Sequence, residues 1–176
     1  MREDPVPAAS TALLDSKPQS GEAPAAATSA PSRHAFIGWA ALVTRLVGAV
    51  AVLVIGVVHL QAYTGPYAAV PTIGVLFVVN FAAAMAIGVT LLLPVEHLAG
   101  RWAGIAIVLV TAAGIGLAAV SLAMLVVSEH GTLFGFHEPG YDPTAISRSK
   151  IAEIAALGLL TFSLGLRVLT KRRLLW

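Results

Sequence analysis

Apolar residues are concentrated in four long blocks of the chain, and short polar segments separate the blocks. The blocks cover 36–61, 71–93, 102–127 and 151–169. Each is near or above the roughly 20 residues with which a helix crosses about 30 Å of hydrocarbon. Proline, glycine or charged residues flank every block, as is typical of helix ends. The pattern predicts an all-α fold, a bundle of four transmembrane helices joined by short connections.

The segment that precedes the first block has a different character. Residues 1–35 are rich in alanine, proline and serine with scattered charges, and such a segment cannot bury enough apolar area to order itself. We expect a disordered tail there, a four-helix transmembrane domain over 36–170, and a short basic C-terminus over 171–176. Since the first apolar block begins late and is full length, it fits a signal anchor better than a cleaved signal peptide.

Composition places this chain in a bilayer. Hydrophobic residues make up 57% of the 176 residues and charged residues only 11%, which a soluble sphere could not accommodate without a large exposed apolar surface. The expected partner is therefore the lipid bilayer and not nucleic acid. A partner membrane subunit or a second copy of the chain stays open, because the third block carries a stripe of small residues that suits either internal packing or association: Ala112, Gly116, Ala119 and Ala123.

Basic residues around the blocks predict the orientation. Five lie on one side of the membrane (Arg33, Arg101, Lys171, Arg172 and Arg173) and two on the other (Arg148 and Lys150). Lysine and arginine are retained on the cytoplasmic side. We therefore predict a multi-pass protein of the plasma (inner) membrane with both termini in the cytoplasm. The inner interface is then marked by Trp39, Trp102 and Trp176, and the outer interface is marked by Tyr63, Tyr67 and Tyr141.

Polar residues inside the blocks follow helical spacing. His59 lies fourteen residues after Arg45, and Glu153 lies fourteen residues before Arg167 in a helix of opposite direction, so Glu153 is expected at the depth of His59. We interpret Arg45 and Arg167 as structural, reaching the cytoplasmic headgroups. Asn80, in the middle of the second block, needs a partner because no water is available there; Thr111 and Thr161 are the candidates.

A direct contact between His59 and Glu153 is the leading prediction for the outer end. A membrane-embedded carboxylate is costly unless it is paired. The outer loop adds His130, His137 and Glu138, and its apolar "LFGF" segment is expected to fold back over His59. Imidazole and carboxylate groups suit zinc or copper(II), so the candidate metal ligands are His59, His130, His137, Glu138 and Glu153. The spacing is no known zinc signature, and solvated loop histidines are the alternative.

Haem fits this pattern less well than copper or zinc. Four-helix haem carriers commonly place facing histidines inside several helices, whereas here His59 alone lies within a block. The chain has no cysteine, which excludes disulfides and thiolate metal sites. Signatures of catalysis, such as Gly-x-Ser-x-Gly, a phosphate loop or His-Glu-x-x-His, do not occur.

The motifs "HLQAY", "PTIGVLFVVN" and "LFGF-x-E-P-G", together with the polar tail, resemble those of small uncharacterised four-span membrane proteins of high-GC Gram-positive bacteria. The resemblance covers 36–169 and brings no activity or site residue with it.

Taken together, the apolar blocks and the polar outer end predict a non-enzymatic binding or accessory subunit of unknown activity, with a metal or polar-ligand site at its outer end. The alternative is a small transporter or channel component.

Overall fold

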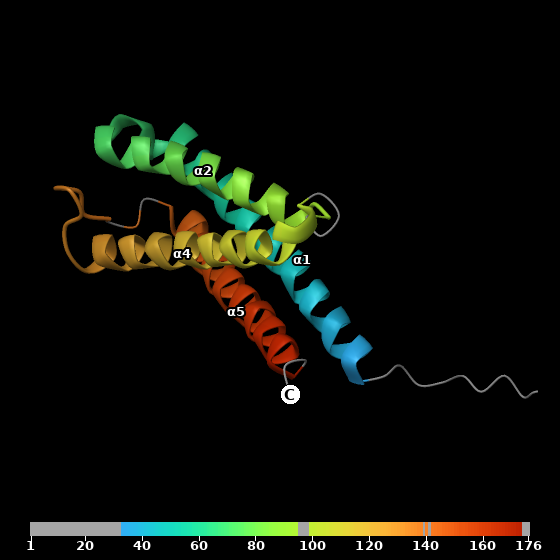
Figure 1. The fold of residues 1–176 in the computed structure, drawn as a ribbon. Coiled ribbons are helices and arrows are strands. Elements are labelled where there is room, and N and C mark those ends of the chain that lie inside the picture. Colours follow the sequence, from blue (N-terminus) through green and yellow to red (C-terminus); the bar gives the residue numbers. More distant parts are fainter. Residues whose placement is uncertain (1–32, 95–98, 139, 141, 174–176) are drawn as a thin grey trace, which may run out of the picture. The chain divides into compact units, whose positions relative to one another are not determined.

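Four long helices make up most of the computed structural model, which describes residues 33–94, 99–138, 140 and 142–173. All four are long and apolar enough to cross a membrane. The all-α, four-helix prediction is confirmed, and the chain has the architecture of a multi-pass membrane protein. Most of the predicted tail lies outside the described residues. The helices (Figure 1) are α1 (Arg33–Thr64), α2 (Pro71–Leu92), α4 (Ala103–His130) and α5 (Pro143–Arg173), with two short 3-10 helices, η1 (Pro66–Ala69) and η2 (Gly100–Trp102).

Helix α5 begins well before its apolar block. Its first residue is Pro143, where a missing backbone N–H has no consequence. The Asp142 carboxylate accepts the backbone N–H of Ala145 at 2.9 Å, which is the N-cap interaction expected for Asp-Pro at a helix start. The extra turns carry Ser149 and Lys150 into the helix, and they bring Ser149 next to Glu153 at 2.9 Å.

The helices pack in a ring in which α1 lies between α2 and α5, and α4 closes the ring between them. Small residues determine how closely the helices approach each other. A methyl group built on Gly48 of α1 would lie 2.6 Å from a Leu160 methyl, and one on Gly114 of α4 would lie 2.8 Å from the other Leu160 methyl. Leu160 of α5 is fully buried. It therefore fills a notch between two helices that only glycine leaves open, as expected for close helix packing in membranes.

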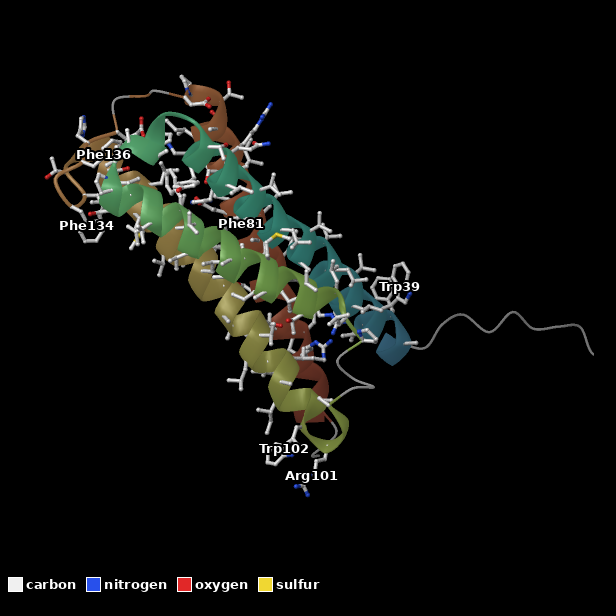
Figure 2. All side chains as sticks on the ribbon, turned by 90° about the horizontal axis from the view of Figure 1, so that it is seen from above. Trp39, Phe81, Arg101, Trp102, Phe134 and Phe136 are labelled. Atoms are coloured by element: carbon white, nitrogen blue, oxygen red, sulfur yellow. The ribbon has the colours of Figure 1, made fainter. Side chains whose placement is uncertain are left out.

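The two ends of the bundle differ in their aromatic residues (Figure 2). Trp39 and Trp102 lie at one end and are 67% and 58% exposed, as interfacial tryptophans are. Phe134 and Phe136 lie at the other end, which we call the hairpin end; there α1 and α4 finish and α2 and α5 begin. Tyr67, predicted for the outer aromatic belt, is instead buried at 4% exposure, because it packs against rings of α2 and the loop.

Candidate functional site

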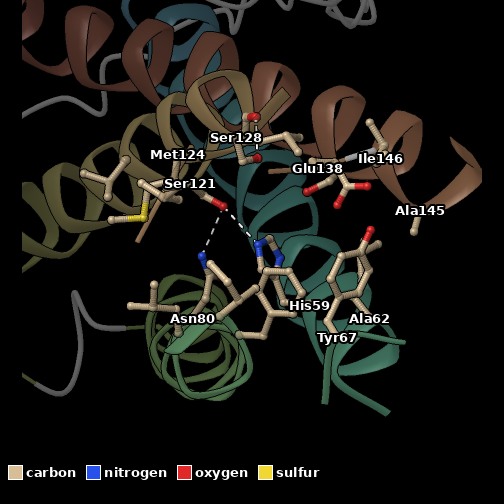
Figure 3. A pocket seen from close by; sticks show the side chains of 18 of the residues that line it. His59, Ala62, Tyr67, Asn80, Ser121, Met124, Ser128, Glu138, Ala145 and Ile146 are labelled. Carbon is tan, nitrogen blue, oxygen red and sulfur yellow. Dashed lines mark hydrogen bonds between the residues drawn. The ribbon is translucent and has the colours of Figure 1, made fainter. Parts of the chain in front are cut away.

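A serine hydroxyl joins polar side chains from all four helices near the hairpin end. Ser121 Oγ of α4 lies 2.6 Å from Glu153 Oε1 of α5, 3.1 Å from His59 Nε2 of α1 and 3.1 Å from Asn80 Nδ2 of α2. Figure 3 shows this hydroxyl between the amide and the imidazole. We call His59, Asn80, Ser121, Ser149 and Glu153 the Ser121 cluster. It ties the four helices together at one level.

Neighbouring groups hold the cluster in place. The His59 ring donates through Nδ1 to the Ile55 carbonyl at 2.8 Å, and the edge of the ring meets Phe77 at 5.2 Å between centroids. Ser149 Oγ donates to the same oxygen of Glu153 that Ser121 contacts. Glu153 is fully buried and His59 is 8% exposed. Hydrogen bonds in such surroundings are stronger than in water.

The hydrogen bonds of the Ser121 cluster restrict its charge, because each bond needs one proton. The Ile55 carbonyl can only accept, so Nδ1 of His59 carries a proton. Ser121 has one proton to donate. If that proton goes to a Glu153 carboxylate, then Nε2 of His59 must also carry a proton to make its contact with Ser121. His59 is then an imidazolium, and the cluster has no net charge.

A second arrangement fits the same heavy-atom positions. Glu153 is then protonated at Oε1 and donates to Ser121, and Ser121 donates to a neutral His59. The cluster is again uncharged. A neutral His59 beside a Glu153 carboxylate would instead leave two acceptors facing each other. Proton exchange between His59 and Glu153 through the Ser121 hydroxyl therefore requires no movement of any heavy atom.

Two acceptor atoms near the cluster have no hydrogen-bond partner among the described residues. They are Asn80 Oδ1 and Glu153 Oε2, and both atoms are buried. A buried acceptor without a donor costs about 1 to 3 kcal/mol. Such groups in a folded protein call for an explanation, of which a bound molecule is one.

A cavity of about 210 Å³ adjoins the cluster. Its polar lining residues include His59, Asn80, Ser121, Ser128, Glu138 and Ser149, and apolar side chains of α2 and α4 line most of the rest (Figure 3). The cavity combines an apolar interior with a few convergent polar groups, which is the usual character of a small-molecule site.

The loop between α4 and α5 forms another wall of this cavity. Leu133 and Phe136 pair through two backbone hydrogen bonds of 2.7 and 2.9 Å. Phe134 and Gly135 between them have φ of 52° and 79°, as in the tight hairpin turns that require positive φ at both central positions. Leu133 and Phe136 both line the cavity, and Phe136 also meets Tyr67 at 6.1 Å. The apolar segment thus folds back toward His59, as the sequence led us to expect.

Glu138, two residues after this segment, is held in place at the same wall. Its backbone N–H donates to the Ser128 carbonyl at 2.8 Å, and its carboxylate accepts the Gly140 N–H at 2.8 Å. The side chain is 7% exposed and lines the cavity. It lies on the same side of the cavity as Tyr67 in Figure 3. The loop therefore presents an ordered polar group beside the aromatic ones.

The predicted metal centre is not assembled. Within 33–94, 99–138, 140 and 142–173, no three histidine or acidic side chains lie close enough together to hold a metal ion. His130 and His137 are exposed, and their Nδ1 atoms bond the carbonyls of Val126 and Gly131. These local bonds hold the His130 ring against the end of α4 and the His137 ring on the loop, whereas His59 and Glu153 lie inside the bundle.

Two further predictions at this level were wrong in detail. His59 and Glu153 do not contact each other directly but through Ser121, and Asn80 bonds Ser121 and neither Thr111 nor Thr161. Sequence reasoning missed Ser121. The available signal was its spacing of three and seven residues from two other small positions of α4, Ala118 and Gly114, all of which are buried. The stripe chosen from the sequence (Ala112, Gly116, Ala119 and Ala123) is exposed.

At the opposite end, Arg45 and Arg167 both line a second cavity, which Leu42 and Leu92 also line. The expectation that Arg45 extends to the headgroups is corrected, because its side chain is only 2% exposed. Nearby, Ser163 of α5 donates to the Ala41 carbonyl of α1 at 2.8 Å. This end therefore has its own polar contacts between α1 and α5.

The resemblance to four-span proteins of high-GC Gram-positive bacteria, which rests on sequence motifs, stays a prediction. Comparison with protein-family models, with curated proteins and with solved structures found no match for this chain.

Proposed function

We propose that this chain is a membrane-embedded binding protein for a small, lipid-soluble molecule with a polar end. The observation that carries the proposal is the cavity beside the Ser121 cluster. Its walls are mostly apolar, and three of its polar side chains, those of His59, Asn80 and Ser121, lie together, so it suits a molecule with one polar and one apolar end. We place the ligand's polar end against Asn80 and Ser121, and its apolar part along α2 and α4.

The surface of the bundle supports access from the bilayer. Val79 of α2 and Val120 of α4 both line the cavity, yet they are 57% and 54% exposed. Both helices are apolar over most of their length, and their exposed side chains are those that face lipid in a membrane protein. The cavity therefore reaches the lipid-facing surface between α2 and α4. A ligand dissolved in the bilayer could enter there without crossing water.

The size of the cavity fits a partly enclosed ligand. At about 210 Å³, it is smaller than the roughly 300 to 1,000 Å³ of pockets that enclose a drug-sized molecule. It has room for a head group and a few carbons. The remaining chain of a longer ligand would leave through the opening between α2 and α4.

Binding is favoured over conduction, the alternative drawn from the sequence. The polar groups near Ser121 and those near Arg45 belong to separate cavities. Between them the described helices are packed with buried apolar residues, among them Leu160, which fills the notch at Gly48 and Gly114. A conducting pathway would need this region to open. Under the predicted orientation, the binding site lies toward the external face of the plasma membrane.

Photolabelling tests the proposed binding. The probe is an eight-carbon alcohol with a diazirine on its chain, added to the full-length protein in lipid nanodiscs, and the labelled residues are identified by peptide mass spectrometry. We expect labelling of cavity residues such as Leu117 and Met124. Ala83→Trp should fill the cavity and abolish this labelling, because Ala83 lines it.

Ala82→Trp is the matched control for that experiment, because Ala82 is exposed on the same helix and does not line the cavity. It should leave the labelling of Leu117 and Met124 unchanged. Labelling spread evenly over the lipid-facing residues, with the same yield in both variants, would show that the probe only dissolves in the bilayer. The proposed function would then be wrong.

A further inference from the structure

We infer that the polar end of the ligand is a hydroxyl group that donates a hydrogen bond to Asn80 Oδ1. This inference rests on the proposed function and names the chemical class that the site accepts. Asn80 lines the cavity, and its Oδ1 is buried without a donor among the described residues. An uncharged lipid-soluble alcohol or phenol supplies the missing donor.

The orientation of the Asn80 amide follows from the proton count in the Ser121 cluster. Ser121 gives its only proton to Glu153 in one arrangement and to His59 in the other. It has none left for Asn80 in either case. Asn80 must therefore present its NH2 group to Ser121, at 3.1 Å, since a turned amide would bring two acceptors together. Its carbonyl oxygen is left for another donor.

The unpaired atoms select among polar groups. Glu153 Oε2 is also buried without a partner in the described part of the chain, but Glu153 does not line the cavity, so Asn80 Oδ1 is the acceptor that a ligand there meets. Ethers, ketones and carboxylates only accept hydrogen bonds, so they leave Asn80 Oδ1 unpaired, and a carboxylate would also bring a charge into a mostly apolar cavity. A hydroxyl donates one hydrogen bond. We therefore expect alcohols to bind more tightly than isomers that lack the O–H group.

A hydroxyl also fits better than an ammonium group. The Ser121 cluster carries no net charge in either proton arrangement, so it has no excess negative charge to offset a buried cation. The carboxylate that lines the cavity, Glu138, already accepts the Gly140 N–H with its Oε1. The rings of Phe77 and Tyr67 meet edge to face at 5.2 Å beside His59. They give the ligand's carbons an apolar neighbour next to the polar wall.

Competition for the photolabelled site tests the hydroxyl assignment. The competitors are three eight-carbon compounds, the alcohol 1-octanol, its isomer 1-methoxyheptane and octylammonium, and each concentration is corrected for partition into the nanodisc. One hydrogen bond to a buried acceptor predicts that 1-octanol competes about 5-fold to 10-fold better than the ether. Octylammonium should compete less well than 1-octanol.

The variant Asn80→Leu removes the acceptor and keeps a side chain of similar size. The advantage of 1-octanol over the ether should fall to less than about 2-fold, since the donor has lost its partner. Thr90→Leu on the same helix is the control, because Thr90 is exposed and bonds its own helix at Ala86. It should leave the ratio unchanged.

The possible outcomes separate the two proposals. Equal competition by 1-octanol and 1-methoxyheptane in the unmodified protein overturns the hydroxyl assignment and leaves the binding site in place. Stronger competition by octylammonium than by 1-octanol also overturns the hydroxyl assignment and leaves the binding site in place. If no compound competes, both the site and the assignment are wrong. The comparison of isomers uses the unmodified chain, so it decides the question even if Asn80→Leu does not fold.

Discussion

His59 and Glu153 lie on different helices and are joined through one hydroxyl group, that of Ser121. The Glu153 oxygen is 2.6 Å and the His59 nitrogen 3.1 Å from it. This hydroxyl both accepts and donates a hydrogen bond. A change in the protonation of His59 or Glu153 therefore affects the other residue through Ser121. Its removal should therefore affect several helices at once.

Ser121→Ala should lower the free energy of unfolding by about 1 to 3 kcal/mol, because His59 Nε2 and Asn80 Nδ2 lose a buried partner together. The measurement is thermal unfolding of the full chain in detergent. Ser128→Ala is the control on the same helix, where the hydroxyl bonds only the Leu125 carbonyl. Its effect should be under about 1 kcal/mol. Equal effects of the two substitutions would contradict the bridging role of Ser121.

His59→Ala and Glu153→Gln should be non-additive. Each breaks the same hydrogen-bonded chain, so the double variant should be more stable than the sum of the two losses predicts, by about 0.5 to 3 kcal/mol. Melting curves of the four proteins in one detergent give this coupling. The control is a second cycle in which His130→Ala takes the place of His59→Ala. His130 is exposed and bonds only Val126, so its substitution should be additive with Glu153→Gln. Strictly additive losses for His59 and Glu153 would show that Ser121 does not link them.

Gly114→Ala and Gly116→Ala should act in opposite directions. A methyl group at Gly114 would lie 2.8 Å from Leu160, which is already held against Gly48 on its other side, whereas Gly116 has open space around it. We expect Gly114→Ala to destabilise by about 1 to 3 kcal/mol. Gly116→Ala should stabilise by up to about 1 kcal/mol through helix propensity. Thermal unfolding in detergent measures both, and a stabilising Gly114→Ala would disprove the tight notch.

Gly135→Ala should loosen the hairpin that lines the cavity. Its φ of 79° lies in the left-handed region, where a side chain costs about 1 to 2 kcal/mol. Hydrogen exchange should show faster exchange of the Leu133 and Phe136 amides, whose mutual bonds close the turn. Gly131→Ala is the comparison, because Gly131 has an extended backbone conformation. Unchanged protection in Gly135→Ala would contradict the turn geometry.

The orientation can be tested with single cysteines, because the chain has none of its own. With both termini in the cytoplasm, cysteines at Thr64 and Thr132 should react with an impermeant thiol reagent in intact cells. Both positions are exposed at the hairpin end. A cysteine at Ala99 should react only after the membrane is permeabilised. Labelling at Ala99 alone in intact cells would reverse the predicted orientation and place the cavity toward the cytoplasm.

The four helices were readable from the sequence, although three of them extend beyond the predicted blocks. Runs of apolar residues long enough to cross a bilayer appear directly in the chain. The dipeptide Asp142-Pro143 has the sequence pattern of a helix start, and the Asp142 carboxylate does cap α5. The matched spacings of fourteen residues placed His59 and Glu153 at one depth. These features depend on residues close together in the sequence, so local pattern was enough to predict them.

Only tertiary packing decides which face of each helix points into the bundle. Ser121, which the sequence did not single out, faces the interior, and the small residues at Ala119 and Ala123 face outward. In a soluble protein the polar side of a helix would have marked its outer face. Here α4 is apolar on all sides, and lipid tails are as apolar as the bundle interior. Hydrophobicity therefore does not distinguish the two faces, and shape complementarity, as between Leu160 and Gly114, determines which side chains meet.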